Sequence, residues 1–197
     1  MIEKILIWLI DLLREVRGHR EKNKKDIQYL CSHLAVSLER YVDGCAAVVG
    51  DDGLYRGQPN KDGYHVTQIE QPKLEIDPHN EEFKLLPTKI MHALVQFPRE
   101  IEIANAKIDG ASEHATPPDY AEAFEERQYQ YAKVGLKAYS LASEIRSLAA
   151  MPQREFSEWS VLEYLKEQQS VIDELRNRRA EENAKFWESL RSNTEGA

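Results

Sequence analysis

Residues Pro118–Ala150 read PDYAEAFEERQYQYAKVGLKAYSLASEIRSLAA, and this stretch decides the fold. Its apolar residues recur at alternating intervals of four and three, a spacing that puts one apolar stripe on one helix face. Arg127 is the only charged residue of the stripe, and Gly135 and Ala142 are small enough to let a neighbouring backbone come close. The stripe consists of Tyr120, Phe124, Arg127, Tyr131, Val134, Ala138, Leu141, Ile145 and Leu148. We therefore predict that this stretch is the central helix of an all-α bundle.

The same spacing predicts three further helices. The first runs from about residue 3 to Val49, either straight or bent at Gly18, and the others run over Phe83–Asp109 and from Ser157 to about Leu190. Pro98 lies inside the second of these without breaking its stripe, so we expect a kink there. Short connections make neighbouring helices antiparallel. The prediction is an up-down-up-down four-helix bundle over residues 26–192, with a disordered tail at 193–197.

Flanking residues predict where the helices begin and end. Thr116 followed by proline is typical of a helix start, and Gly110 is typical of a helix end. Ser157 is the expected N-cap of the last helix. In an up-down-up-down order, the two chain ends lie together, and Phe186 and Trp187 could then pack on the apolar residues near the N-terminus.

The first 25 residues combine an apolar helix face with a basic run, and form an amphipathic extension of the first helix. At 100° per residue, the charged residues of the first turns cluster within a ~120° arc, which leaves an apolar face of ~240°. The residues expected to make apolar contacts are Ile5, Trp8, Leu9, Leu12 and Leu13, and those expected to supply charge are Arg14, Arg17, Arg20, Lys22, Lys24 and Lys25.

Charge is distributed unevenly along the chain. Seven basic and four acidic residues give residues 1–25 a net charge of +3. Because the whole chain has a net charge of −8, the remaining residues carry −11. An acidic body argues against nucleic acid as the main partner. A basic segment beside an apolar one is typical of contact with an anionic surface.

Two interpretations of the N-terminal segment remain open. The apolar run Ile5–Leu13 includes Asp11 and is far shorter than the ~20 residues of a spanning helix. The basic residues follow the apolar run rather than precede it, unlike those of a signal peptide. The helix lies either in a membrane interface, with its basic run on anionic head groups, or against protein, namely its own bundle, a partner or a second copy.

Cysteine usage points to a reducing compartment. Cys31 and Cys45 lie on one predicted helix, ~21 Å apart along its axis, which is too far for a disulfide. They indicate buried thiols. With 30% charged and 42% hydrophobic residues, the chain has the composition of a soluble or peripheral helical protein. The expected location is the cytoplasm or the inner face of the membrane.

Residues 50–86 form a long connection rich in glycine and proline, which excludes a continuing helix. We expect a long loop or a small β-hairpin that pairs Leu54–Arg56 with Tyr64–Gln68. The connection also holds the polar residues of an alternative functional site, which are Asp51, Asp52, His65 and His79.

Motifs that carry chemistry are absent from the sequence. It has no calcium-loop spacing, no HExxH or CxxC, no phosphate-binding glycine loop and no Glu-x-x-His pair on a helix. We therefore predict no catalytic residue, no metal site and no cofactor.

Several segments resemble a group of uncharacterised bacterial helical proteins. The segments are Ser37–Tyr41, Cys45–Val49, Asp51-Asp52, Leu86-Pro87, Pro98–Ala104 and Lys133–Arg146. Many proteins of that group begin with an N-terminal membrane segment, so the resemblance implies membrane association. It implies no catalytic residues. The present chain departs from the pattern at its N-terminus, where the apolar run is short and includes Asp11.

These features favour a non-enzymatic helical interaction protein. It would dock through its N-terminal amphipathic basic helix to a membrane surface, to a protein partner or to itself as a homo-oligomer. The alternative is a bundle or enzyme that binds a small molecule or metal under the 50–86 loop.

Overall fold

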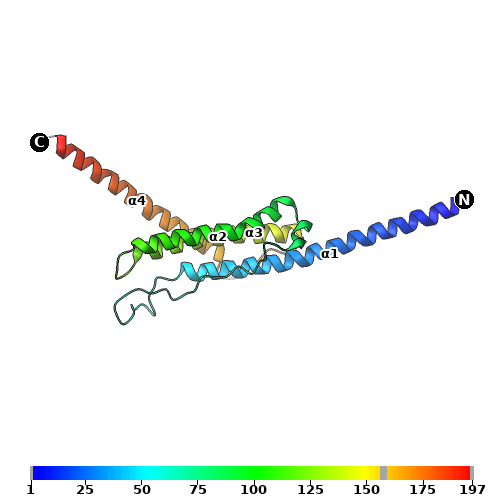
Figure 1. Ribbon diagram of the computed structural model, residues 1–197, viewed down its shortest axis with the longest axis horizontal. Helices are drawn as coiled ribbons and strands as arrows, with labels where there is room; N and C mark the ends of the chain where they lie inside the picture. The colour runs from blue at the N-terminus through cyan, green and yellow to red at the C-terminus, as the bar shows by residue number, and fades with distance from the viewer. Residues whose placement is uncertain (1, 156–158, 196–197) are drawn as a thin grey trace.

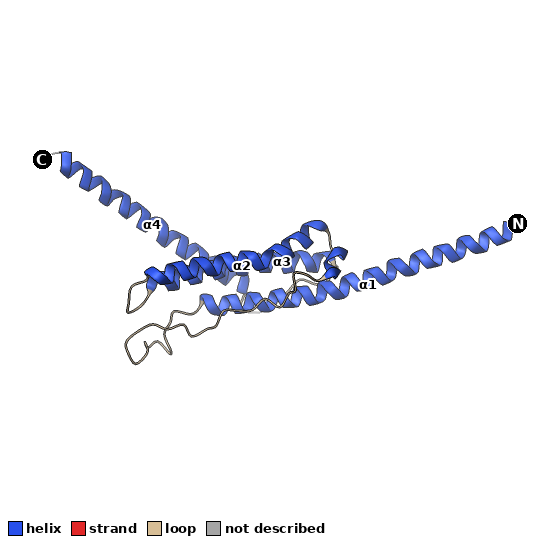
Figure 2. Cartoon of the chain, viewed as in Figure 1, coloured by secondary structure: helices blue, strands red, loops and turns tan. Residues whose placement is uncertain are grey.

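The computed structural model describes residues 2–155 and 159–195, and for residues 2–20, 189–190 and 192–195 it describes only the course of the backbone. The elements are α1 (Ile2–Val49), the 3₁₀ helix η1 (Glu81–Leu85), α2 (Thr88–His114), α3 (Ala121–Leu148) and α4 (Val161–Glu195) (Figure 1). The described residues include no strand, as Figure 2 shows. The prediction of an all-α fold with four long helices is confirmed.

Helix α3 is the centre of the bundle, because it contacts α1, α2 and α4. Its stripe is buried from Arg127 to Ile145, and Ala138 and Ile145 have no exposed surface. Gly135 lies where two neighbouring helices come close to α3. A Cβ placed on Gly135 would lie 3.0 Å from the Cβ of Cys45 on α1 and 2.9 Å from Cδ1 of Leu165 on α4. A small residue at this position therefore lets two helices flank α3 at one level.

Side-chain pairs fix the direction of each helix. Along α1 the partners on α3 run in reverse order, and the same is true of α2 and α4. The pairs are Glu39–Arg146 and Cys45–Gly135 for α1, Lys89–Glu144 and Asn105–Tyr131 for α2, and Leu165–Gly135 and Arg176–Glu126 for α4. Hence α1, α2 and α4 are all antiparallel to α3 and parallel to one another. The up-down-up-down prediction is wrong at the first connection.

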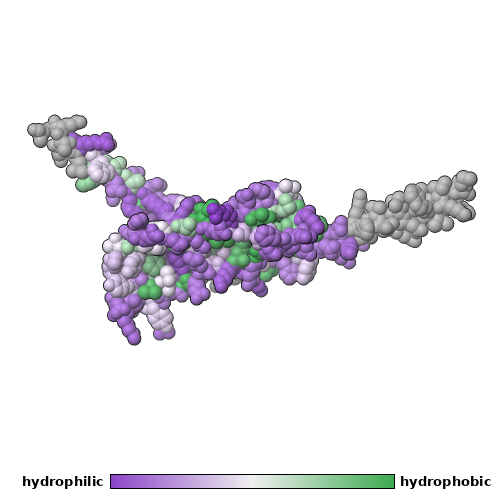
Figure 3. All heavy atoms as spheres, in the orientation of Figure 1, coloured by the Kyte–Doolittle hydropathy of each residue, from purple (hydrophilic) through white to green (hydrophobic). Residues whose placement is uncertain are grey.

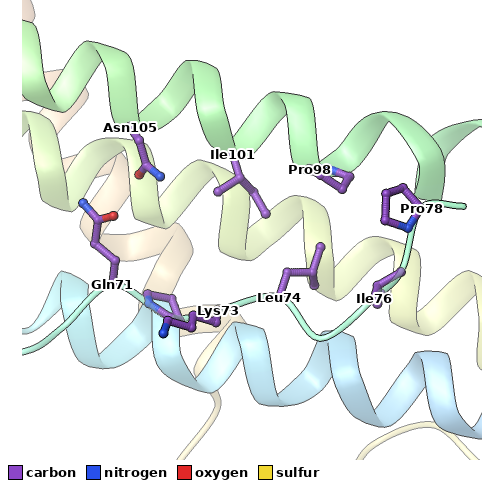
Figure 4. Close-up of a pocket in the computed structure, with 9 residues that line it drawn as sticks. Gln71, Lys73, Leu74, Ile76, Pro78, Pro98, Ile101 and Asn105 are labelled. Carbon is purple, nitrogen blue, oxygen red and sulfur yellow. The ribbon is translucent and has the colours of Figure 1, made fainter.

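The long connection explains this error. About 30 extended residues can reach ~100 Å, whereas the buried part of α1 is only ~35 Å long. Residues 71–78 run back along α2, so the chain returns to the opposite end before α2 begins (Figure 4). Leu74 and Ile76 of this segment pack against the core. The rule of antiparallel neighbours applies only to short connections.

The predicted β-hairpin of Leu54–Arg56 with Tyr64–Gln68 does not form. Tyr55 instead pairs with Gln58 in an isolated antiparallel bridge, with N–H···O distances of 3.0 and 3.1 Å. This tight turn uses backbone groups of Tyr55 that the hairpin would need. The connection is the long loop that was the other expectation.

Two predicted helix ends of α2 and α3 are wrong. Helix α2 continues past Gly110 to His114, since a glycine inside a helix costs only about 1 kcal/mol relative to alanine. Helix α3 begins at Ala121, after an N-cap at Tyr120 rather than at Thr116. Pro98 lies inside α2, which runs through it, and the kink expected there stays a prediction.

Helix α4 begins at Val161, and Ser160 caps it by accepting a hydrogen bond from the N–H of Glu163 at 3.3 Å. The cap predicted at Ser157 lies outside the described residues. At its other end α4 reaches Glu195. The predicted tail at 193–197 therefore overlaps the last turn of α4, and its final two residues lie outside the described residues.

The two ends of the chain lie at opposite ends of the molecule (Figure 1). Helix α4 starts beside the C-terminal end of α1, with Tyr164 near Gly50. It then runs in the same direction as α1 and leaves the bundle. The expected packing of Phe186 and Trp187 on the N-terminal residues is therefore wrong. Both side chains are more than half exposed and contact each other.

Candidate functional site

The N-terminal arm, which is residues 2–26 of α1, carries the residues predicted to dock. Helix α1 is continuous, and Figure 1 shows the arm leaving the bundle with no other described helix alongside it. Lys22, Lys24 and Lys25 are exposed, and burial begins at Ile27 and Leu30. The remaining predicted residues lie outside the side chains that the structure describes: Ile5, Trp8, Leu9, Leu12, Leu13, Arg14, Arg17 and Arg20.

A groove of about 390 Å³ lies at the root of the arm, where α3 stops covering α1. Leu148 of α3 is 38% exposed there and is the last residue of its stripe. The groove is lined by Asn23, Lys24, Ile27, Gln28, Leu148, Ala149 and Ala150. Its wall is therefore mainly apolar, and it marks the point where the apolar stripe of α1 loses its neighbour.

The structure brings together three of the four polar residues predicted for the alternative site. Asp51 and Asp52 follow α1 directly, and Nδ1 of His65 lies 2.9 Å from the carbonyl oxygen of Asp52. His79 is exposed. Its neighbour Asn80 lines a groove near the start of the buried part of α1. His79 thus lies near the far end of the bundle, roughly 30 Å from Asp51 along α1.

Asp51 forms a buried ion pair with Arg127. Oδ2 of Asp51 accepts hydrogen bonds from Nη1 of Arg127 at 2.9 Å and from the N–H groups of Gln68 and Ile69 at 2.9 and 3.0 Å. Oδ1 accepts from the N–H of Gly53 at 3.0 Å. The two side chains are 1% and 6% exposed. Four donors therefore satisfy this carboxylate away from water.

The same residues fasten the connection to α3. Arg127 also donates to the carbonyl of Ile69, and Gln128 donates to the carbonyl of Asp51 at 3.0 Å. We call this network the loop clasp; it consists of Asp51, Gly53, Gln68, Ile69, Arg127 and Gln128. Burial by itself would raise the pKa of Asp51, but hydrogen bonds from Ile69, Gly53, Gln68 and Arg127 outweigh it and lower the pKa. The carboxylate is therefore held ionised.

One residue of the loop clasp, Arg127, could have been recognised from the sequence as needing a buried partner. Arg127 is the one charge on a stripe that is otherwise apolar, and a buried charge requires a partner of opposite sign. Asp51 was predicted separately as a ligand in the connection. Gln68, Ile69 and Gln128 carried no such signal, because two of the contacts use backbone N–H groups, which every non-proline residue has.

A second groove, of about 380 Å³, lies between residues 71–78 and α2. Figure 4 shows the extended segment on one side and Pro98, Ile101 and Asn105 of α2 on the other. Asn105 already accepts a hydrogen bond from the hydroxyl of Tyr131 at 2.9 Å. None of the four residues predicted for the alternative site lines this groove. Among the described residues, no group of three or more His, Cys, Asp or Glu side chains is arranged to hold a metal.

Cys31 and Cys45 are free and buried, as predicted. Within the described part of the chain, no helix is long and apolar enough to cross a membrane. A scan of protein-family models, a search of curated proteins and a search of solved structures each return no match. Any proposal for this chain therefore rests on its own residues.

Proposed function

We propose that this chain is a non-enzymatic helical interaction protein that docks through its N-terminal arm to a membrane surface, a protein partner or a second copy. One observation carries the proposal: α1 continues as a helix well past the point where the bundle ends (Figure 1). The arm combines this position with an apolar face of ~240° and a net positive charge over residues 1–25.

An apolar helix face needs a neighbour to be stable. In water, most of the stability of a helix comes from packing its apolar face rather than from intrinsic propensity. The described bundle supplies no helix beside the arm. The visible face of the bundle in Figure 3 is mainly hydrophilic, with only scattered hydrophobic residues. Docking is therefore best supported at the arm rather than on that face.

The bundle holds the buried half of α1 firmly against α3. Midway along the buried half of α1, Glu39 accepts two hydrogen bonds from Arg146 of α3, at 2.6 and 2.9 Å. Both side chains are less than one-fifth exposed, and paired charge-assisted bonds of this kind are among the stronger ones. At the C-terminal end of α1, the loop clasp holds the following connection. Helix α1 is thus fixed to α3 over its buried half.

Deletion of residues 2–17 tests the proposal. Full-length and shortened proteins are compared for mass by light scattering, and for flotation with neutral and with anionic phospholipid vesicles. We expect the deletion to abolish self-association or vesicle binding while thermal unfolding of the bundle remains cooperative. A matched deletion of residues 181–197, which removes the projecting part of α4, should leave both properties unchanged. If the deletion of residues 2–17 changes neither mass nor flotation, the proposal is wrong.

A further inference from the structure

The apolar face of the N-terminal arm is the face that α1 turns toward α3 in the bundle. Leu9 and Cys45 are about ten turns apart at 3.6 residues per turn, and so are Leu13 and Val49. On a continuous helix each pair therefore shares one angular position. Cys45 has no exposed surface and packs on Gly135 of α3, and Val49 is 2% exposed. The stripe that α3 covers thus continues onto the arm.

This alignment distinguishes between a membrane and a second protein helix as the neighbour of the arm's apolar face. An interfacial helix sinks its apolar face into the head-group boundary. With α1 straight, the membrane would lie on the same side of α1 as α3. Helix α3 is about 10 Å across, so its exposed end near Ser147 and Leu148 would have to enter the bilayer. A second protein helix on this face meets no such obstacle, because it takes the place that α3 leaves.

We propose that the occupant is a second copy of this chain, whose arm lies antiparallel on the first; this inference rests on the proposed function. A parallel pair would direct the α1 of each copy into the space that α3 occupies from Ile27 onward. An antiparallel pair places the two bundles at opposite ends. Each arm then ends before it reaches α3 of the other copy. The symmetry is a closed two-fold, the commonest form of homo-oligomer.

One register suits the residues of the arm. With the pair centred on Asp11, which occupies an outer heptad position, the four central core layers are apolar and one opposite-charge pair forms twice by symmetry. Ile10 and Leu12 then flank the core, each beside its own counterpart, which explains why the apolar face is wider than one stripe. The layers are Leu6 with Val16 and Leu9 with Leu13 of the second copy, and the charge pair is Glu3 with Arg17 of the second copy.

The same register accounts for the polar break in the stripe. The stripe of α1 turns polar at Arg20 and Asn23; its residues up to Leu34 are Ile2, Leu6, Leu9, Leu13, Val16, Arg20, Asn23, Ile27, Leu30 and Leu34. In the proposed pair, the second arm ends near Arg20, and α3 covers α1 only from about Ile27. Arg20 therefore meets only the last residues of the second arm, and Asn23 falls in the short part of the stripe that neither neighbour covers. Asn23 is exposed in the structure, as this arrangement requires.

Cysteine cross-linking of the full chain tests the pairing. Ile10→Cys places two thiols beside each other across the two-fold, whereas Asp11→Cys places them on opposite outer faces. Native Cys31 and Cys45 are buried, and burial raises the pKa of both thiols, so a short bis-thiol reagent should act at the introduced site. We expect a covalent dimer with Ile10→Cys and at least ten-fold less with Asp11→Cys.

A charge exchange tests the register separately. Glu3→Arg and Arg17→Glu should each raise the dimer dissociation constant several-fold in sedimentation, and the double variant should restore it. Cross-linking with Leu13→Cys but not with Ile10→Cys would indicate parallel arms and overturn the inference. A monomer that floats with anionic vesicles would also overturn it, while the proposed function would stand. A monomer that binds no vesicle would argue against both.

Discussion

The two halves of α1 share one sequence pattern and lie in different surroundings. From Leu30 to Val49 the stripe packs against α3, and Leu38 and Cys45 have no exposed surface. In the described part of the arm, residues 21–26 are exposed all round. The four–three spacing runs through both halves. Periodicity therefore shows which face of a helix is apolar, but it does not show which element covers that face.

The largest effect is expected where the bundle half of α1 passes into the connection. Arg127→Ala leaves the carboxylate of Asp51 buried without its charged partner. Removing one member of a buried ion pair costs about 3–5 kcal/mol. We expect a loss of this size in the free energy of unfolding, measured by urea denaturation.

A surface ion pair between α3 and α2 provides the control. Lys137 and Glu100 lie 3.0 Å apart, but both side chains are at least 40% exposed. Lys137→Ala should cost no more than about 1 kcal/mol. Replacing both members of the buried ion pair, with Asp51→Asn and Arg127→Met, should lower the free energy of unfolding less than Arg127→Ala alone, because no charge is then left buried. Equal losses for Arg127→Ala and Lys137→Ala would show that the loop clasp contributes nothing special.

The next effect compares the two halves of α1 directly. Leu38→Ala removes a fully buried side chain and should lower the free energy of unfolding by about 2–5 kcal/mol. Leu12→Ala makes the same change in the arm. At protein concentrations below those of self-association, it should change bundle unfolding by less than about 0.5 kcal/mol. A similar loss for both variants would mean that the arm is part of the bundle core.

Much of the fold followed from periodicity alone. The spacing of apolar residues predicted four long helices and the central place of α3, while it left open whether α1 bends at Gly18. It could not predict the direction of α2, because direction depends on where residues 71–78 lie. That segment packs Leu74 and Ile76 on the core. Its apolar and polar residues alternate from Gln71 to Pro78, a period of two that indicates an extended, half-buried segment but not the direction in which it runs.

The candidate site was predicted less completely than the fold. Arg127 and Asp51 were each recognised as unusual, yet their pairing spans α3 and the connection and has no local spacing rule. Asp51 accepts three of its four hydrogen bonds from backbone N–H groups, and Arg127 donates to the backbone carbonyl of Ile69. Backbone groups are present at every position, so the sequence gives no sign of these contacts. The arm was recognised from its composition, whereas its alignment with the α3-facing stripe emerged only once Gly135 was placed beside Cys45.

The smallest effect concerns acid. Because the pKa of Asp51 is lowered in the folded chain, the unfolded chain binds a proton at this residue more readily than the folded one. Its stabilising contribution is therefore complete above the unfolded pKa of about 4 and is lost as pH falls through the lower folded pKa. Asp51→Asn removes that dependence, and Asp62→Asn, an equal change on an exposed loop residue, keeps it. Urea unfolding between pH 7 and pH 2.5 should thus give a shallower loss of stability for Asp51→Asn than for wild type. Parallel curves for Asp51→Asn and wild type would show that Asp51 and Arg127 do not form an ionised pair. The arm variant Leu12→Ala should follow wild type throughout, since it leaves the loop clasp unchanged.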